Sequence, residues 1–503
     1  MSEEKDLQEL RTRLREIKDL RAATSILYWD QATYMPPAGA KARAQQIGTL
    51  SRLTQEKLID PALGKLLEDL ASYESELPYD RDEASLIRIT RREYERATKV
   101  PPQFVADFNA HSAESYGVWT RARPEDDFSK TFPYLQKTLD LSRQYADFFP
   151  GYDHIADPLI DESDYGMKAE TVRQLFTQLR QGLVPLVQTI TDQPPADDSC
   201  LYEIYPEEKQ LAFGRQVIED FGYDFNRGRQ DKTPHPFMIG FSVNDVRITT
   251  RVKENKLDEA LFGTLHESGH AMYELGINPA YEGTLLARGT SSGVHESQSR
   301  LWENQVGRSR AFWDHYFPKL QKTFPDQLGR VSLDDFYQAI NKVQRSLIRT
   351  EADEVTYNLH VMIRFDLELD MLEGNLAVED LPDAWHARYE SDLGLRAPDD
   401  RDGVLQDMHW FSGFIGGAFQ GYTLGNIMSA MFFDQAVRES PQIPEEIGRG
   451  EFGSLHGWLK ENIYQHGRKF TAEELVQRVT GGPITIEPYM RYLRTKFGEL
   501  YDL

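Results

Sequence analysis

The sequence has very little cysteine and no long apolar run. Cys200 is the only cysteine among the 503 residues, so an internal disulfide and a cysteine-based zinc site are both excluded. Any metal ion must therefore be held by histidine, aspartate or glutamate. No stretch approaches the ~18 consecutive apolar residues that a membrane span needs, and the opening MSEEKDLQELRTRLRE contains no apolar secretory core. We therefore expect a cytoplasmic protein that does not enter a membrane.

The sequence also has fewer basic than acidic residues. The chain has 57 Lys and Arg residues against 81 Asp and Glu residues, which gives a formal net charge of −24. Such a charge repels nucleic acid and anionic lipid, so we expect neither as a partner. Hydrophobic residues make up 40% and charged residues 27% of the chain, which excludes a disordered or collagen-like protein. No internal repeat is present, so a solenoid is not expected.

The dominant pattern is helical. Near the start Leu10, Leu14 and Ile17 recur at steps of three and four residues, as an amphipathic helix requires. The prolines of Tyr34–Gly39 should interrupt the next helix. Further helical patterns cover about residues 40–75, 80–120, 130–150 and 166–192. The Pro- and Asp-rich segment 191–200 could divide the chain into subdomains, but we favour a surface loop within one domain of residues 1–503.

One segment has the alternation of a strand. Polar and apolar residues alternate from Asp245 to Val252, which places Asp245, Arg247 and Thr249 on one face. A hairpin with residues 237–243 is expected, so the sequence predicts a small sheet inside a mainly α fold. A polar face of this composition would line a groove, although a solvated strand face explains it nearly as well.

Residues 257–276 predict a helix that carries His266, Glu267 and His270. Residues four apart project from one face of a helix, so both imidazoles can reach a single ion. Glu267 is placed to act on a water molecule rather than to ligate. Two neutral imidazoles leave zinc strongly acidic, and the ion lowers the pKa of water toward ~7. A neighbouring carboxylate can then take the proton during attack on a carbonyl. The alternative is a pair of surface histidines with no metal.

Zinc needs a third protein ligand, and Glu296 is our choice. The segment 290–305 begins with Ser and Gly, which favour a helix start, and continues with a helical pattern. Glu296 follows His270 by 26 positions, which allows one connection and the antiparallel return of a second helix. A His/His/Glu set leaves one coordination position open, as in catalytic sites. Glu296 could instead be a carboxylate that only stabilises the helix start.

Two neighbouring residues compete with Glu296 for this role. His295 would point about 100° away from Glu296 on a helix. Glu303 would lie two turns further along the same face, which suits a residue that holds a ligand in place rather than the metal itself.

Several separated motifs in this chain resemble those of the carboxypeptidase Taq-type (thermostable carboxypeptidase 1) zinc metallocarboxypeptidases, which carry the HEXXH signature. The motifs are, in chain order, His235-Pro236-Phe237, Asp245-x-Arg247-x-Thr249, His266-Glu267-x-x-His270, His295-Glu296-Ser297-Gln298, Ile348-Arg349-x-x-Ala352-Asp353 and Gly403-x-x-Gln406-Asp407-x-His409-Trp410. The segment LYWDQATYMPP near the amino terminus also fits. The resemblance therefore spans nearly the whole chain.

The resemblance implies that His266, His270 and Glu296 bind zinc and that Glu267 is the catalytic acid and base. It also implies a large helical zincin-type peptidase with a deep central groove, similar to the neurolysin and angiotensin-converting enzyme group, and a homodimer. Members of this family remove single carboxy-terminal residues with broad preference and disfavour proline there. We therefore expect peptide substrates with a free carboxy terminus. Cobalt or manganese can substitute for zinc in such a site.

The segment 348–368 predicts a helix with a polar stripe that includes Arg349 and Asp353. A carboxypeptidase must bind a free carboxylate, and the planar donors of arginine suit it. Arg349, oriented by Asp353 one turn further on, is our first candidate, with Arg364 and Arg247 as alternatives.

The remaining substrate contacts are assigned to His235 and to the strand face of Asp245, Arg247 and Thr249.

The segment 406–426 is rich in glycine and aromatic residues, which close packing alone could explain. The side-chain donors of His409 and Tyr422 could stabilise a tetrahedral oxyanion opposite the metal, and related zinc peptidases carry a similar His…Gly-Gly…Tyr run. Two other functions stay open at this point. The first is a cytosolic zinc oligoendopeptidase with the same metal chemistry, and the second is a non-catalytic helical scaffold.

Overall fold

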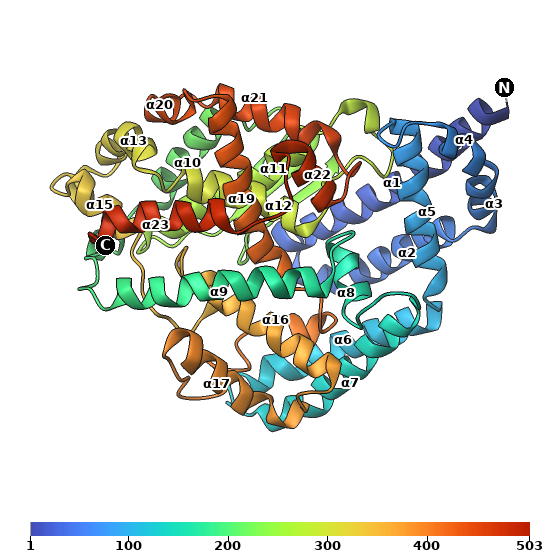
Figure 1. Ribbon diagram of the computed structural model, residues 1–503, viewed down its shortest axis with the longest axis horizontal. Helices are drawn as coiled ribbons and strands as arrows, with labels where there is room; N and C mark the ends of the chain where they lie inside the picture. The colour runs from blue at the N-terminus through green and yellow to red at the C-terminus, as the bar shows by residue number, and fades with distance from the viewer. Residues whose placement is uncertain (1) are drawn as a thin grey trace.

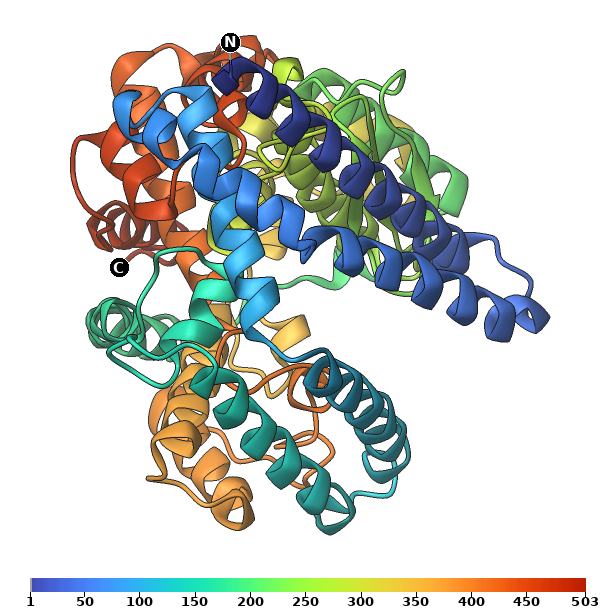
Figure 2. The ribbon, with the colours of Figure 1, turned by 90° about the vertical axis from the view of Figure 1, so that its right-hand side faces the viewer.

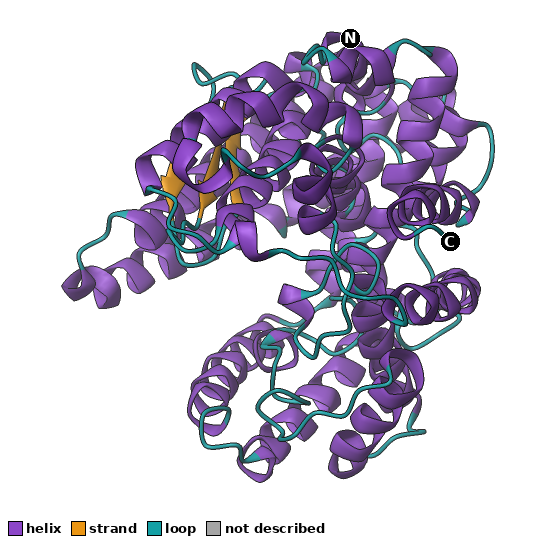
Figure 3. Cartoon of the chain, turned by 90° about the vertical axis from the view of Figure 1, so that its left-hand side faces the viewer, coloured by secondary structure: helices purple, strands orange, loops and turns teal. Residues whose placement is uncertain are grey.

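The computed structural model describes residues 2–503 and confirms a mainly α fold (Figure 1). The strands form one small sheet among the helices (Figure 3). Within residues 2–503, no helix combines the length and the apolar character needed to cross a bilayer.

The helices fall before and after the sheet in the chain. Those before it are α1 (Ser2–Thr33), α2 (Ala40–Leu58), α3 (Pro61–Asp69), α4 (Ala71–Glu76), α5 (Asp82–Lys99), α6 (Pro102–Ala122), α7 (Phe128–Asp147), α8 (Asp157–Ser163), α9 (Ala169–Thr191) and α10 (Glu207–Phe221). Those after it are α11 (Leu257–Leu275), α12 (Ser292–Arg300), α13 (Arg310–Thr323), α14 (Pro325–Leu328), α15 (Leu333–Ile340), α16 (Tyr357–Glu373), α17 (Leu381–Leu393), α18 (His409–Ser412), α19 (Gln420–Glu439), α20 (Ile443–Gly448), α21 (Gly453–Asn462), α22 (Ala472–Thr480) and α23 (Glu487–Tyr501).

The helices form two regions on either side of α9, which runs across the middle of Figure 1. Helices α6, α7, α16 and α17 lie together below it, although the first two are far from the last two in sequence. Helices α1 and α2 form a long hairpin on the other side, seen in blue in Figure 2. Buried apolar side chains from α6 to α23 nevertheless make one continuous core.

The amino-terminal elements agree with the sequence pattern. Leu10, Leu14 and Ile17 are fully buried in a second, smaller core beneath α1, α3 and α5. Helix α1 ends at Thr33, directly before the proline-containing turn. The segment 191–200 is a largely exposed loop after α9, as expected. The single domain of residues 1–503 stays a prediction.

The sheet supports the helix that carries the histidine motif. Strands β1 (Gln230–Lys232), β2 (Met238–Ser242) and β3 (Asp245–Thr250) lie in the order β1-β3-β2. The antiparallel pairing of β2 with β3 confirms the predicted hairpin, whereas the parallel partner β1 was not predicted. Val246 and Ile248 are buried on β3, which contacts α11.

The helix predicted over residues 348–368 is wrong in its first part. Only a short 3-10 turn, η5 (Arg349–Glu351), precedes α16, which begins at Tyr357. The carboxylate of Asp353 accepts hydrogen bonds from the backbone N–H groups of Val355 and Thr356, at 2.9 and 3.0 Å. Such local bonds compete with helical ones, so the chain turns at Asp353 instead of continuing as a helix.

Two glycines let three helices approach closely. A Cβ at Gly269 of α11 would lie 2.5 Å from the carbonyl oxygen of Gln298 on α12. A Cβ at Gly425 of α19 would lie 2.5 Å from the Cβ of Glu296. Real Cβ atoms do not make such contacts, so α12 is held between α11 and α19 only because both positions are glycine.

We predict that Gly269→Ala lowers the free energy of unfolding by about 1–3 kcal/mol, because the added methyl group must push α11 and α12 apart. Gly263→Ala on the same helix is the control, since a Cβ there meets no atom within 4 Å. That change should stabilise the helix by about 1 kcal/mol. Scanning calorimetry of both variants measures the difference, and equal midpoints would contradict the close approach.

Candidate metal centre

Helices α11 and α12 bring two histidines and one glutamate together. The possible ligand atoms of His266, His270 and Glu296 all lie within 4.8 Å of one another. Oε2 of Glu296 is 3.6 Å from Nε2 of His266 and 3.4 Å from Nε2 of His270. Two imidazole nitrogens and a carboxylate oxygen are the donor set of a catalytic zinc site, so these residues fit a divalent ion.

Glu296 carries its negative charge in a buried position. Burial opposes ionisation, but Arg300, His266 and His270 outweigh it and hold the pKa of Glu296 well below its usual range. Nε of Arg300 donates to Oε1 of Glu296 at 2.8 Å, which leaves Oε2 facing the histidines. The carboxylate is therefore ionised and oriented before any cation binds.

Glu303 orients His266, as the sequence predicted. Its Oε2 lies 2.9 Å from Nδ1 of His266 and 3.2 Å from Nη1 of Arg300. The residue sits in a π-helical turn, η4 (Leu301–Val306), that continues α12. An Nδ1–H that donates to Glu303 leaves the Nε2 lone pair of His266 free for a metal.

His270 is oriented by a second, longer chain of contacts. Its Nδ1 lies 2.8 Å from Nδ1 of His295, whose Nε2 lies 2.9 Å from Oε1 of Glu274. If His295 donates from Nε2 to Glu274, its Nδ1 accepts from Nδ1–H of His270. Nε2 of His270 is then unprotonated and faces Glu296. His295 therefore supports a ligand instead of competing with Glu296.

Glu267 lies beside the histidines with 7% of its surface exposed. Burial raises the pKa of Glu267 to about 7. A carboxyl group with such a pKa can both accept and return a proton near neutral pH.

These groups line one cavity of about 900 Å³, a size that suits a short peptide. Its walls include Pro236–Met238, the segment 288–292, Arg349, Tyr357 and Tyr422. The proposed metal ligands and the arginine predicted to bind a carboxylate therefore face the same space.

Arg349 is held by a partner that the sequence did not predict. Its Nη2 lies 2.8 Å from Oδ1 of Asp407, and its Nη1 donates to the hydroxyl of Tyr357 at 3.0 Å. The expected orientation of Arg349 by Asp353 is wrong, because Asp353 is engaged with the backbone before α16. Arg364 is fully buried and also pairs with Asp407, so two guanidinium groups share one carboxylate.

Asp245, Arg247 and Thr249 lie outside the set of described residues that line the cavity, so the polar wall expected on β3 stays a prediction. Arg247 pairs with Asp245 at 2.8 Å and lies over the ring of Trp29. The hydroxyl of Thr249 accepts from the backbone N–H of Phe237 at 2.9 Å. This strand face therefore braces the segment that forms the wall.

His235 directly precedes that segment and is exposed to solvent. Its carbonyl oxygen accepts a hydrogen bond from the hydroxyl of Thr233 at 2.7 Å. The cavity wall begins at the next residue, Pro236.

The two proposed oxyanion donors occupy different positions. Tyr422 lines the cavity, and burial raises the pKa of its hydroxyl, which therefore stays protonated. Nε2 of His409 lies 3.4 Å from that hydroxyl, behind Tyr422, and its Nδ1 lies 3.7 Å from Asp407. The geometry suits Tyr422 as the donor and His409 as the residue that positions it.

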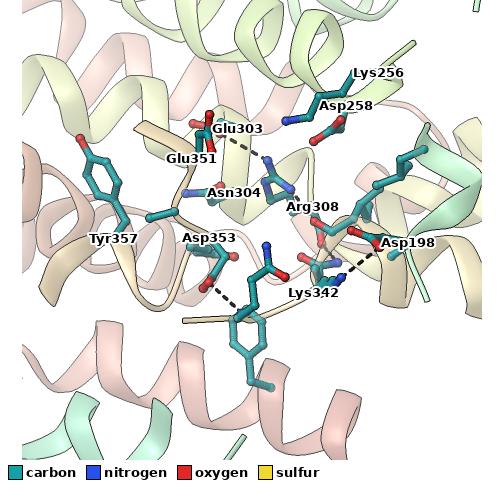
Figure 4. A pocket seen from close by; sticks show the side chains of 18 of the residues that line it. Asp198, Lys256, Asp258, Glu303, Asn304, Arg308, Lys342, Glu351, Asp353 and Tyr357 are labelled. Carbon is teal, nitrogen blue, oxygen red and sulfur yellow. Dashed lines mark hydrogen bonds and ion pairs between the residues drawn. The ribbon is translucent and has the colours of Figure 1, made fainter. Parts of the chain in front are cut away.

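A smaller polar cavity of about 150 Å³ is lined by Glu303, Arg308 and Tyr357, among others (Figure 4). Figure 4 shows Arg308 extending toward Glu303, and the two groups are 3.7 Å apart. Burial opposes ionisation of Glu303, but Arg300, His266 and Arg308 outweigh it and lower its pKa. Arg300 and Tyr357 line both cavities, so the support of the metal ligands is polar on its far side as well.

Three supporting residues were missed in the sequence. Arg300 follows Glu296 by four positions, a spacing that indicates an ion pair on a helix. Glu274 likewise follows His270 by four positions on α11, but its contact is with His295. Asp407 lies within a quoted motif, yet its pairing with a residue 58 positions away leaves no local signal.

We predict that Glu303→Gln weakens metal binding roughly 10- to 100-fold, because an amide orients His266 less firmly than a carboxylate does. Glu219→Gln on α10 removes the same charge from an exposed residue that does not line the cavity, and it should leave metal affinity unchanged. Competition with a chelator of known affinity measures both variants. A Glu303→Gln protein that binds metal as tightly as the wild type would contradict this role.

Comparison with known proteins identifies the family. The family model of the carboxypeptidase Taq (M32) metallopeptidases matches residues 9–497. Thermostable carboxypeptidase 1 of Thermus thermophilus is 40% identical over 100% of both chains, and carboxypeptidase 1 of Bacillus subtilis is 34% identical over 97% of each.

Solved structures agree with this result. The M32 carboxypeptidase of Deinococcus radiodurans has a TM-score of 0.97 and 51% identity, with 99% of this chain and 100% of that chain covered. The carboxypeptidase of Pyrococcus furiosus has a TM-score of 0.94 and 32% identity, with 98% and 99% covered. The similarity therefore extends over the cavity and everything that supports it, and the chain belongs to the carboxypeptidase Taq (M32) metallopeptidase family.

Proposed function

We propose that this metallocarboxypeptidase is a zinc enzyme that removes single residues from the carboxy termini of peptides. The observation that supports this most strongly is that one cavity is lined by the His/His/Glu cluster, Glu267 and Arg349. A metal cluster alone would suit many hydrolases, whereas a cluster and a buried guanidinium in the same space suit a substrate that ends in a carboxylate.

Arg349 binds the terminal carboxylate in this proposal. Asp407 pairs with both Arg349 and Arg364, so one positive charge is left over for an anion. Arg349 has 6% of its surface exposed yet lines the cavity. A substrate carboxylate that binds Arg349 loses its contact with water. Its hydrogen bonds to the guanidinium group are strong because they form in this buried environment.

Glu267 is the general base and then the general acid. His266, His270 and Glu296 would hold zinc, which would supply a Lewis acid to polarise the scissile carbonyl and make water more acidic. Glu267 accepts a proton from the attacking water and returns it to the leaving amine, which a pKa near neutrality permits.

Tyr422 completes the site as a neutral donor. Its protonated hydroxyl can donate to the oxygen that becomes negative during attack, and His409 holds that hydroxyl in place.

The finer properties rest on the family resemblance. On that resemblance we propose broad preference at the carboxy terminus with proline disfavoured, and a homodimer. Cobalt or manganese as substitutes for zinc follow from the His/His/Glu ligand set, and the cytoplasmic location expected from the sequence stays a proposal.

A peptide digest followed by mass spectrometry tests the proposed reaction. We predict a ladder of products shortened one residue at a time from the carboxy terminus, lost on chelation and restored by zinc. Glu267→Gln should retain the metal and lose activity, because the amide cannot accept a proton. Internal cleavage instead of a ladder would indicate an oligoendopeptidase.

Peptides with a free or an amidated carboxy terminus test Arg349. The wild type should prefer the peptide with a free carboxy terminus. Arg349→Gln should lower kcat/KM for that peptide on the order of 100-fold, which corresponds to a loss of about 3 kcal/mol of transition-state stabilisation. The amidated peptide serves as the internal control, because its poor turnover should change little. A variant that still prefers the free acid as strongly as the wild type would remove Arg349 from this role.

A further inference from the structure

Basic side chains from three parts of the chain meet at one end of the metal cavity. Arg21 lies on α1, Arg288 precedes α12, and Arg468 lies between α21 and α22. Oε1 of Glu93 on α5 is 2.7 Å from Nη2 of Arg468, and the charge of Arg21 interacts with those of both Glu93 and Arg288. Arg288, Arg468 and Glu93 line the cavity that also holds the metal ligands.

Arg468 has a donor with no partner. The residue is 5% exposed, and its Nη1 is buried without a hydrogen-bond partner among residues 2–503. A buried guanidinium group normally has its donors satisfied. An unused donor on a residue that lines a cavity indicates a place for an acceptor brought by a ligand.

The positive charge at this end exceeds the negative charge that faces it. Within residues 2–503, the structure gives Arg21 and Arg288 no ion pair. Burial lowers the pKa of Arg468, and Arg288 and Arg92 lower it further, while Glu93 opposes them.

The other charged groups nearby do not remove this excess. Glu274 accepts from His295 and from the backbone N–H of Gly289, and its negative charge also acts on Arg288 and Lys18, so it offsets one positive charge of the group. Lys18 adds positive charge and donates to the carbonyl oxygen of Ala287 at 3.2 Å. Arg92 pairs with Asp161 at 2.9 Å and with Glu93 at 3.0 Å, so Arg92 and Arg468 share the Glu93 carboxylate.

Arg349 and this basic cluster are connected by contacts to different metal ligands. On one side, Arg349 contacts Tyr357, over whose ring Arg300 lies at 4.7 Å, and Arg300 holds Glu296.

On the other side, His270 contacts His295, which contacts Glu274, and Glu274 accepts from the backbone of Gly289, next to Arg288. A peptide whose carboxy terminus reaches Arg349 would therefore extend its upstream residues toward the basic cluster.

We propose that Arg288 and Arg468, with the charge of Arg21 beside them, form an anion-binding subsite that takes the carboxylate side chain of a peptide residue upstream of the scissile bond. The proposal rests on the proposed carboxypeptidase function, because Arg349 sets the direction of the peptide. An acidic side chain supplies the acceptor that Nη1 of Arg468 lacks and balances the excess positive charge. Peptides with an upstream Asp or Glu are thus the preferred substrates.

A set of neutral peptides with a single Glu, moved one position at a time upstream of the last residue, tests this subsite. Each is compared with the matching Gln peptide. The wild type should show a Glu/Gln ratio of kcat/KM of about 10 at one position, since a hydrogen bond to a charged group contributes roughly 1.5 kcal/mol. Raised salt should reduce the ratio.

Arg288→Glu is the main variant, because its exposed side chain can change without disturbing the core. It should bring the ratio to one or below, and Arg468→Lys, which keeps the charge but loses the planar donors, should lower it partly. Arg52→Glu is the matched control, since this exposed residue of α2 makes the same charge change on the surface. That variant should keep the wild-type ratio.

The results separate this proposal from the proposed function. A ratio near one at every position in the wild type, or a ratio unchanged by Arg288→Glu, would overturn the subsite even if carboxy-terminal ladders form. Absence of ladders on the Gln peptides would overturn the carboxypeptidase reaction itself. Stabilisation of the wild type by inorganic phosphate, together with a ratio of one, would assign the cluster to a free anion and overturn its role in peptide binding.

Discussion

The close contact of α12 with α11 and α19 fixes the geometry of the metal centre. The glycines at 269 and 425 leave no side chain between the helix backbones, so Glu296 can lie opposite the two histidines of α11. A shift of one helix by the width of a methyl group would move the carboxylate away from both imidazoles. The apolar face of β3 supports α11 from the other side. Packing far from the reacting atoms therefore sets the distances on which the chemistry depends.

The metal centre also requires buried carboxylates that stay ionised, and a positive side chain within the site balances their charge. Glu296 and Glu303 are both buried, and Arg300 contacts each of them. A buried carboxylate without a partner would be strongly disfavoured and would become protonated. A protonated Glu296 would bind a cation poorly, so the contact with Arg300 is needed to keep this carboxylate ionised. Arg300 lies one turn further along α12, so the helix itself places the guanidinium group beside Glu296. The chain as a whole is acidic, yet both ends of the cavity present arginine.

Local periodicity predicted the elements whose cause is local. The amphipathic pattern of α1, the hairpin of β2 and β3 and the helix with His266 and His270 all follow from spacings of two or four residues. Glu296, 26 positions after His270, was predicted as the third member of the cluster, but other pairings distant in sequence were not predicted. Asp407 pairs with Arg349 across 58 positions, and β1 joins β3 in parallel. The turn before α16 was missed because the side-chain bonds of Asp353 outweigh a helical pattern that continues through it. The π-helical turn that carries Glu303 has no periodic signature either.

X-ray absorption spectroscopy of the zinc-loaded protein tests the central claim most directly, because it reports the atoms around the ion. The arrangement of α11 and α12 predicts two imidazole nitrogens and oxygen donors at about 2.0–2.2 Å. A spectrum without imidazole scattering, with the ion surrounded by oxygen alone, would contradict it.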